Sequence, residues 1–263
     1  MEIIRIRWVS GERTKGCEKV PIEIMKELRE VKSKESGVEI DVGKLNLEEI
    51  HVDLENEEEA HYLIYENSKE SFEKNFKTLF IGGDHSIDYS IVRAFDKIED
   101  NPLLIVFDSR GDCLSGEGEF PKDNSWLRML IEKGFDGSKI VLIGMRNVSV
   151  DEMKFLKKNK VTLIGMDVLQ EDLHDVCDIV MERARSSSGF YVSIGMNVVD
   201  PCCVPGGVDL DVGGLSSRDL IYFIKRLNCL DNFKGASVNS IDVDKDVNGM
   251  RATLVPKLVC EMI

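Results

Sequence analysis

Several acidic residues and one histidine follow short apolar runs of this 263-residue chain, where they could bind a metal ion together. His85 follows one apolar run, Asp108 and Asp112 follow the next, and Asp242 lies near the end of the last one. An imidazole and several carboxylates gathered in one place favour a divalent cation or a cationic ligand, because unpaired anions repel one another. The alternative is that these residues are ordinary polar starts of loops.

The apolar runs alternate with segments of helical periodicity, and this alternation predicts a parallel sheet covered by helices on both faces. We expect strands at 1–8, 37–42, 78–81, 103–107, 140–143, 161–164, 190–194 and 236–243. We expect helices at 22–28, 55–75, 86–97, 125–134, 151–158, 171–184, 216–227 and 250–262. Ligands of such sheets bind outside the carboxyl ends of the strands. The polar residues after the strands should therefore meet at one edge.

The composition favours one α/β domain over residues 1–263, because 43% of the residues are hydrophobic and the length is too short for two full-sized domains. The apolar runs are far shorter than the roughly 20 residues that a membrane span requires. A net charge of −14 argues against a nucleic-acid partner, since binding phosphates requires clustered Lys and Arg. The first eight residues lack the layout of a secretory signal, so we expect a cytoplasmic protein with no membrane partner.

Seven scattered cysteines are typical of reduced thiols and not of a disulfide framework. No spacing resembles C-x-x-C, which argues against a zinc site made of cysteines. The adjacent pair Cys202 and Cys203 is the exception to this scatter, and it lies in a loop that follows a predicted strand.

Five short motifs, taken together, resemble the arginase and agmatinase (ureohydrolase) family. They are GGDHS at 82–86, DSRGD at 108–112, IGMRN at 143–147, the Ser, Asp-Pro and Pro-Gly series within 193–206, and GGL at 213–215. The resemblance implies a three-layer α/β/α fold with a mainly parallel sheet of about eight strands. It also implies the family's chemistry, which is hydrolysis of a guanidinium group by water that bridges two manganese ions.

The resemblance implies six metal-ligand positions, of which this chain retains half. The retained ligands are His85, Asp108 and Asp112. The positions that have lost their ligand carry Arg110, Gly195 and Asn197. The first manganese would keep three ligands, and the second would keep only the shared Asp108. We therefore expect no cofactor, or one Mn²⁺ or other divalent ion at partial occupancy.

Arg110 suggests how the charge of a lost ion is replaced. Its guanidinium stays protonated at any relevant pH, so we expect it to act as an internal counter-ion, bidentate to Asp108 or Asp112. By resemblance, the family's proton-shuttling histidine would fall at Ser125 or Trp126, and neither residue is a base near neutral pH.

Three functions remain open from the sequence. The first is a member of the family that has lost the dimanganese hydrolase centre and acts by binding or assembly. The second is a hydrolase of C–N bonds in a guanidine or amidine substrate that uses a single metal. The third is an unrelated catalytic use of the loop with Cys202 and Cys203. Asp242 matches the family's guanidinium-binding glutamate and could bind a small cationic ligand, and the resemblance implies a homo-oligomer or association with a paralogue.

Overall fold

A computed structural model describes residues 1–31, 33–74, 77–116, 118–248 and 251–263 of the chain. Within these residues, eight parallel strands form one sheet in the order β2-β1-β3-β8-β7-β4-β5-β6. The strands are β1 (Glu2–Ile6), β2 (Asn46–Ile50), β3 (Thr78–Ile81), β4 (Pro102–Phe107), β5 (Ile140–Met145), β6 (Thr162–Gly165), β7 (Gly189–Gly195) and β8 (Phe233–Asn239). The predicted parallel sheet of about eight strands is confirmed.

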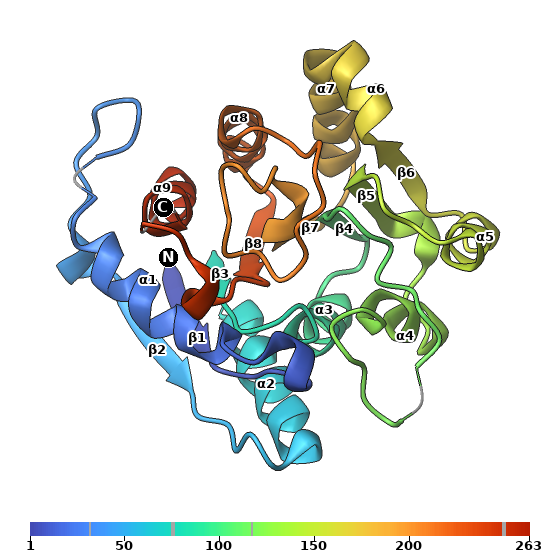
Figure 1. The fold of residues 1–263 in the computed structure, drawn as a ribbon, viewed down its shortest axis with the longest axis horizontal. Coiled ribbons are helices and arrows are strands. Elements are labelled where there is room, and N and C mark those ends of the chain that lie inside the picture. The colour runs from blue at the N-terminus through green and yellow to red at the C-terminus, as the bar shows by residue number, and fades with distance from the viewer. Residues whose placement is uncertain (32, 75–76, 117, 249–250) are drawn as a thin grey trace.

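Helices cover both faces of the sheet, which gives the predicted three layers (Figure 1). One face packs against α1 (Val20–Leu28), α6 (Met166–Glu171), α7 (Leu173–Arg185), α8 (Ser217–Asn228) and α9 (Arg251–Met262). The other face packs against α2 (Glu57–Glu73), α3 (Ile87–Ile98), α4 (Trp126–Glu132) and α5 (Val150–Lys158). Side chains of a strand point alternately to its two faces. In β4, Ile105 and Phe107 therefore join one hydrophobic cluster while Leu104 and Val106 join the other.

The structure differs from the prediction in two places. The strand expected at 37–42 is wrong, because that stretch makes only an isolated bridge between Ser33 and Glu39. The strand in this region is β2, whose sequence NLEEI is polar because it lies at the edge of the sheet and is largely exposed. The helix expected at 171–184 is α7, to within two residues, but the short α6 before it was not predicted. Asp172 separates the two helices, since it takes an extended conformation and caps α7 by accepting from the backbone N–H of Asp175.

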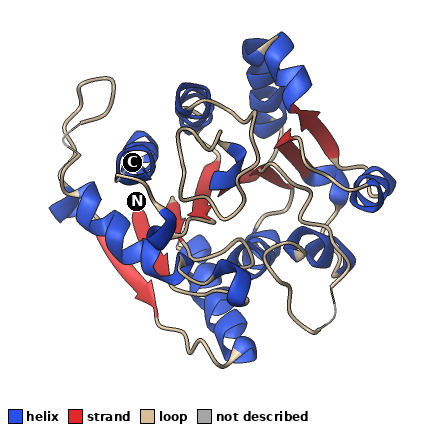
Figure 2. Cartoon of the chain, viewed as in Figure 1, coloured by secondary structure: helices blue, strands red, loops and turns tan. Residues whose placement is uncertain are grey.

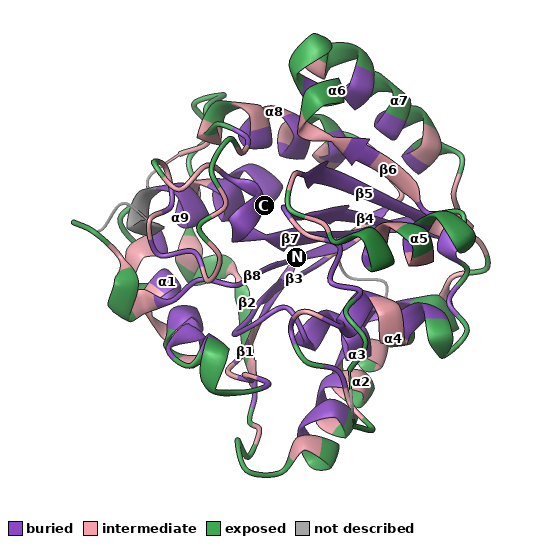
Figure 3. Cartoon of the chain, turned by 45° about the vertical axis from the view of Figure 1, so that its right-hand side comes forward, coloured by how far each residue is buried: buried purple, intermediate pink, exposed green. Residues whose placement is uncertain are grey.

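The middle of the sheet brings the predicted polar residues to one edge. Strands β3, β8, β7 and β4 are neighbours and run parallel, so the loops that follow them start side by side. These strands are buried on both faces, while exposed residues lie on the outward sides of the helices (Figure 3). Loops, tan in Figure 2, connect the strand ends to the helices. No helix among the described residues is long and apolar enough to span a lipid bilayer.

Candidate metal centre

His85 is the central residue of the strand-end site. Its side chain is 2% exposed, and its Nδ1 lies 3.0 Å from Asp108 Oδ2 and 2.9 Å from Asp112 Oδ2. Burial opposes a charged imidazole, but the bonds to Asp108 and Asp112 outweigh it and raise the pKa of His85 well above its ordinary value. A protonated His85 therefore offsets part of the negative charge of these two carboxylates.

The other ring nitrogen of His85 faces a buried polar network beneath the site. His85 Nε2 lies 2.7 Å from Ser193 Oγ, and the Ser193 hydroxyl donates to Asp88 Oδ2 over 2.6 Å. Asp88 is fully buried and also accepts from Ser237 and Asn239. Because Ser193 uses its proton on Asp88, it accepts the Nε2 proton of His85. This chain of bonds turns Nδ1 toward Asp108 and Asp112, as the partners of metal-binding histidines commonly do.

The two carboxylate oxygens of Asp108 have different surroundings. Oδ1 accepts from the backbone N–H of Arg110 over 2.8 Å and from Asn197 Nδ2 over 2.9 Å. Oδ2 is buried and has no hydrogen bond of standard geometry, and the same holds for Asn197 Oδ1. Both oxygens flank Gly195, where an added Cβ would lie 2.3 Å from Asp108 Oδ2 and 2.8 Å from Asn197 Oδ1. The absence of a side chain at Gly195 is what lets these groups approach.

Asp112, together with His85 and Asp108, forms a group that we call the triad. Its backbone is left-handed (φ 46°), a conformation that an aspartate tolerates better than most residues. Its Oδ2 accepts from the indole N–H of Trp126 over 2.9 Å. Burial, and then the charge of Asp108, raise the pKa of Asp112 to about 7. Trp126 stands at one of the two positions where the resemblance places a proton shuttle. Here it donates a hydrogen bond to a retained ligand.

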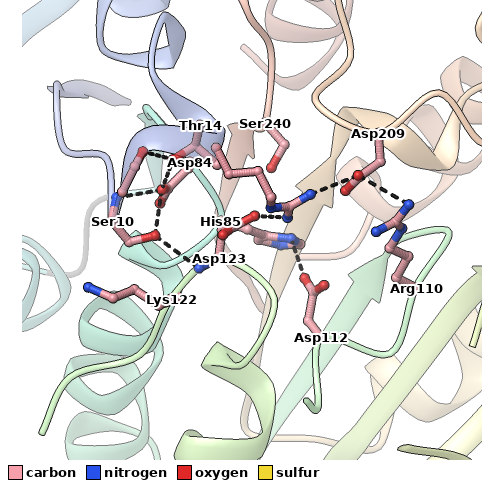
Figure 4. Close-up of polar contacts among 12 residues, drawn as sticks. Ser10, Thr14, Asp84, His85, Arg110, Asp112, Lys122, Asp123, Asp209 and Ser240 are labelled. Atoms are coloured by element: carbon pink, nitrogen blue, oxygen red, sulfur yellow. Dashed lines mark hydrogen bonds and ion pairs between the residues drawn. The ribbon is translucent and has the colours of Figure 1, made fainter. Parts of the chain in front are cut away.

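The predicted role of Arg110 is wrong. Its guanidinium turns away from the triad and pairs with Asp209 (3.1 Å) and Asp211 (3.0 Å), as Figure 4 shows for Asp209. Only the backbone N–H of Arg110 reaches Asp108. The physical reason is that His85 already pairs with Asp108 and Asp112, while the loop after Pro205 brings two other carboxylates to the guanidinium of Arg110.

A second charged layer lies next to the triad. Asp209 binds Arg13 as well as Arg110, and Arg13 also pairs with Asp123. Burial, and then the charge of Asp84, raise the pKa of Asp123 to about 6, although Arg13 opposes this. Asp123 is close enough for its charge to contribute to the raised pKa of Asp112. A guanidinium of the chain itself thus lies between two carboxylates beside the candidate metal centre.

Asp84 ties the N-terminal segment to the turn after β3, which carries His85. It is fully buried, and it accepts from the hydroxyls of Ser10 (2.7 Å) and Thr14 (2.6 Å) and from the backbone of Ser10 (Figure 4). Gly83 allows the same approach, since a Cβ there would lie 1.9 Å from the carbonyl oxygen of Trp8.

Asp242 is buried and already has partners. Its carboxylate pairs with Lys245 over 3.0 Å and accepts from the backbone N–H of Asp244. Gly16 packs against it so closely that a Cβ would lie 2.2 Å from Asp242 Oδ1. Binding of a small cation at Asp242 stays a prediction, and Lys245 would have to leave for it to occur.

The donor set fits one divalent ion. His85 Nδ1, Asp108 Oδ2 and Asp112 Oδ2 lie within 4.8 Å of one another, and Asp108 Oδ2 is a buried acceptor without a donor of standard geometry. Carboxylate oxygens with one imidazole suit Mn²⁺ and similar ions, which would replace the Nδ1 proton. A second ion does not fit, because Asp108 Oδ1 accepts from two N–H donors and Gly195 offers no ligand.

Several residues of this site were not predicted from the sequence. Asp88 lies in the first turn of α3, three positions after His85, and its backbone N–H donates to the carbonyl oxygen of His85, so a spacing of three could have identified it. Arg13, Asp123, Asp209 and Asp211 carry no local signal, since the pairs of Arg13 and Arg110 join residues about a hundred or more positions apart.

Comparisons with known proteins find relatives of this chain among the arginases and a formimidoylglutamase. Arginase of Staphylococcus aureus is 30% identical over 213 residues, which is 72% of this chain and 70% of that protein. Arginase 1 of Arabidopsis thaliana is 28% identical over 235 residues (87% and 67%), and formimidoylglutamase of Bacillus subtilis is 25% identical over 180 residues (65% and 56%). The match thus spans less than two thirds of the latter enzyme's length.

Solved structures show the same fold. The structure of formimidoylglutamase from Bacillus subtilis has a TM-score of 0.91 at 21% identity and covers 99% of this chain and 85% of its own. The agmatine ureohydrolase of Thermoplasma volcanium has a TM-score of 0.85 at 21% identity, with coverages of 99% and 87%. The model of the arginase family matches residues 3–263. This chain therefore belongs to the arginase family.

Proposed function

We propose that this chain is a member of the arginase family that has lost the two-metal hydrolytic reaction and acts by binding or assembly. The observation that carries this proposal is the environment of Asp108 Oδ1, which accepts from Asn197 Nδ2 (2.9 Å) and from the backbone N–H of Arg110 (2.8 Å). A carboxylate shared between two ions must offer an oxygen to each. In this chain, Oδ1 of Asp108 is instead occupied by two N–H donors.

The chemistry of the family explains why this difference matters. Lowering the pKa of water from 15.7 toward 7 requires strong Lewis acids, and a bridging hydroxide requires two ions. The second position offers a neutral amide at Asn197 and no side chain at Gly195. Trp126 donates to Asp112 and is not a base. We therefore infer that water at this centre is not activated as a two-metal enzyme would activate it.

Arg13 supports a role in binding. Its guanidinium lies between Asp123 and Asp209, and the segment that carries it is fixed by the bonds of Ser10 and Thr14 to Asp84. Without Arg13, Asp123 and Asp209 would attract a small cationic ligand. The guanidinium of Arg13 occupies that position instead. Such a ligand has to compete with an arginine whose effective concentration is high, because it belongs to the same molecule.

A second function is favoured by the triad itself. His85 Nδ1 is 2.9–3.0 Å from one oxygen each of Asp108 and Asp112, so these three atoms could hold one divalent ion. Such an ion would act as a Lewis acid toward water or a C–N substrate. Asp123, with its pKa raised to about 6, is the nearby carboxylate that could take up a proton. This alternative is a single-metal hydrolase of a guanidine or amidine.

Metal content and turnover separate the two functions. The protein is dialysed against Mn²⁺ and then against metal-free buffer, its metal is measured, and urea release from arginine, agmatine and other guanidines is assayed. We expect at most one ion per chain and no urea above the blank. Turnover with one ion would favour the single-metal hydrolase, and two bound ions with turnover would overturn both proposals.

A matched pair of variants assigns any bound ion. Asp112→Asn removes a ligand of the triad, and Asp151→Asn makes the same change at an exposed residue of α5. We expect the first variant to lose the ion and the second to retain it. Equal metal content in both variants would place the ion elsewhere.

Arg13 is tested by binding of a small cation. Calorimetry with agmatine should show weak or no binding to the wild type and measurable binding to Arg13→Ala, because Asp123 and Asp209 then lack their guanidinium. Lys15→Ala is the control, since Lys15 pairs only with the exposed Glu12. No gain in Arg13→Ala would contradict a binding site closed by Arg13.

The assembly is inferred from the resemblance. We propose a cytoplasmic homo-oligomer, or an association with a paralogue. Sedimentation velocity of the purified chain, alone and with an intact family member from the same source, measures both. A monomer that does not bind the paralogue would refute the assembly part of the proposal.

A further inference from the structure

Cys202 and Cys203 place two thiols side by side at the surface. Their Sγ atoms are 3.8 Å apart, with Cys202 exposed and Cys203 half-buried against the larger hydrophobic cluster. The pair lies in the turn after β7 and the short helix Met196–Val198, and it belongs neither to the triad nor to the charged layer around Arg13. By contrast, Cys229 is also exposed but its bond is to a backbone carbonyl.

Asp200 fixes the turn that carries both thiols. Its carboxylate accepts from the backbone N–H of Cys202 over 2.9 Å, and its carbonyl oxygen accepts from those of Cys203 (2.9 Å) and Val204 (3.3 Å). The carboxylate also accepts from the backbone of Gly213 over 2.8 Å. A ligand that takes both sulfur atoms would therefore meet a turn that is already ordered, which lowers the entropic cost of binding.

The protonation of Cys202 limits the chemistry of the pair. The hydrogen bond with Asp200, and then the bond with Cys203, raise the pKa of Cys202 to about 12. A thiol with so high a pKa is almost entirely protonated near neutral pH and is a poor nucleophile. This argues against the catalytic use of this loop and against rapid thiol–disulfide exchange. It favours a ligand that reacts with two neutral thiols.

We propose that Cys202 and Cys203 chelate a trivalent arsenical. In this condensation an arsenic–oxygen group reacts with both thiols, so that two S–As bonds form and the two S–H bonds break. The two protons leave with the oxygen as water, and neither arsenic nor sulfur changes oxidation state. Soft sulfur ligands select soft ions of this class, and two sulfur atoms held side by side bind one arsenic atom more tightly than either does alone.

Phenylarsine oxide tests the site in the full-length, reduced protein. One equivalent should add a single phenylarsenic group in the intact mass and protect both thiols from maleimide. A dithiol such as 1,2-ethanedithiol should release the group, whereas the same concentration of a monothiol should not. We expect Cys202→Ser to weaken binding by about 10²–10⁴-fold, because it removes the chelate, and Cys229→Ser to leave it unchanged.

A separate control shows whether the cysteine variants fold. Cys202 is exposed, so Cys202→Ser should keep the thermal unfolding profile of the wild type. If Cys203→Ser does not fold, because that side chain is half-buried, Cys202→Ser alone decides. Unchanged affinity in Cys202→Ser, or reaction of both thiols with maleimide in the presence of one equivalent of phenylarsine oxide, would overturn the proposal.

Discussion

The two sides of the strand-end centre differ in what they offer to a cation. On one side, one oxygen each of Asp108 and Asp112 lies within 3.0 Å of His85 Nδ1. On the other side, Asn197 and the backbone of Arg110 present N–H donors to the remaining oxygen of Asp108. One carboxylate thus faces a cation site with one oxygen and a set of neutral donors with the other.

The comparison teaches how buried carboxylates are paired when few cations surround them. The buried oxygens of Asp108 and Asp112 face a proton on His85 and the neutral donors of Asn197 and Trp126, which lowers the cost of burying them. Arg110 instead neutralises a different pair of carboxylates, Asp209 and Asp211. We therefore expect the two sides to respond differently to substitution.

The largest effect is expected from introducing, in one chain, the three ligands that the family resemblance implies. Arg110→His, Gly195→Asp and Asn197→Asp in one chain would return two carboxylates and an imidazole to the second side. The side-chain ends nearest Gly195 belong to Asp108, Asn197 and His85, which could turn to bind an ion. We expect a second Mn²⁺ per chain by elemental analysis. If the triple variant folds and binds no more metal than the wild type, the backbone of the second side has been remodelled.

Removal of His85 should have the next largest effect. In metal-free buffer, His85→Ala leaves Asp108 and Asp112 buried without their cation, which should cost about 3–5 kcal/mol of unfolding free energy. Chemical denaturation measures this loss, and His51→Ala, at a histidine that is 86% exposed, should change stability by less than about 0.5 kcal/mol. Similar losses in both variants would show that His85 is not the counter-ion of the triad.

Asn197→Asp tests the donor side with a single atom exchanged. The change replaces the amide group that donates to Asp108 Oδ1 by an oxygen. In the presence of a chelator, we therefore expect the free energy of unfolding to fall by about 1–3 kcal/mol. Asn147→Asp is the matched control, because its amide donates to Asp211 at the surface. Recovery of the loss on adding Mn²⁺ would show that the donor side can still become a metal side.

Arg110→Ala should have the smallest effect. The guanidinium is 31% exposed and binds only the outer carboxylates, so its loss should cost about 1 kcal/mol and leave the metal content unchanged. Urea denaturation and elemental analysis of the same sample measure both quantities. A change in metal content would mean that Arg110 acts on the triad after all.

The sequence predicted the fold well where hydrophobic periodicity decides it. Strand β3 was located to the residue, and the β4 and β7 strands to within one residue at each end, because buried parallel strands are continuous apolar runs. The edge strand β2 was missed, since its residues are polar and its position depends on pairing with β1. A polar strand carries little local signal.

The site was predictable only in its local part. His85, Asp108 and Asp112 were expected to meet because each follows a strand, and the structure brings them together. The direction of Arg110 was not predictable from its position between two aspartates. It depends on Asp209 and Asp211, which reach it from about a hundred residues further along the chain.

The link between Asp84 and the segment of Ser10 and Thr14 has a consequence for how the protein is handled in the laboratory. A carboxylate with no exposed surface depends on hydroxyl groups that lie some seventy positions earlier in the chain. A truncation that removes Ser10 and Thr14 would strand that negative charge in the interior, one residue away from His85. Shortened versions of the protein should therefore keep Ser10 and Thr14.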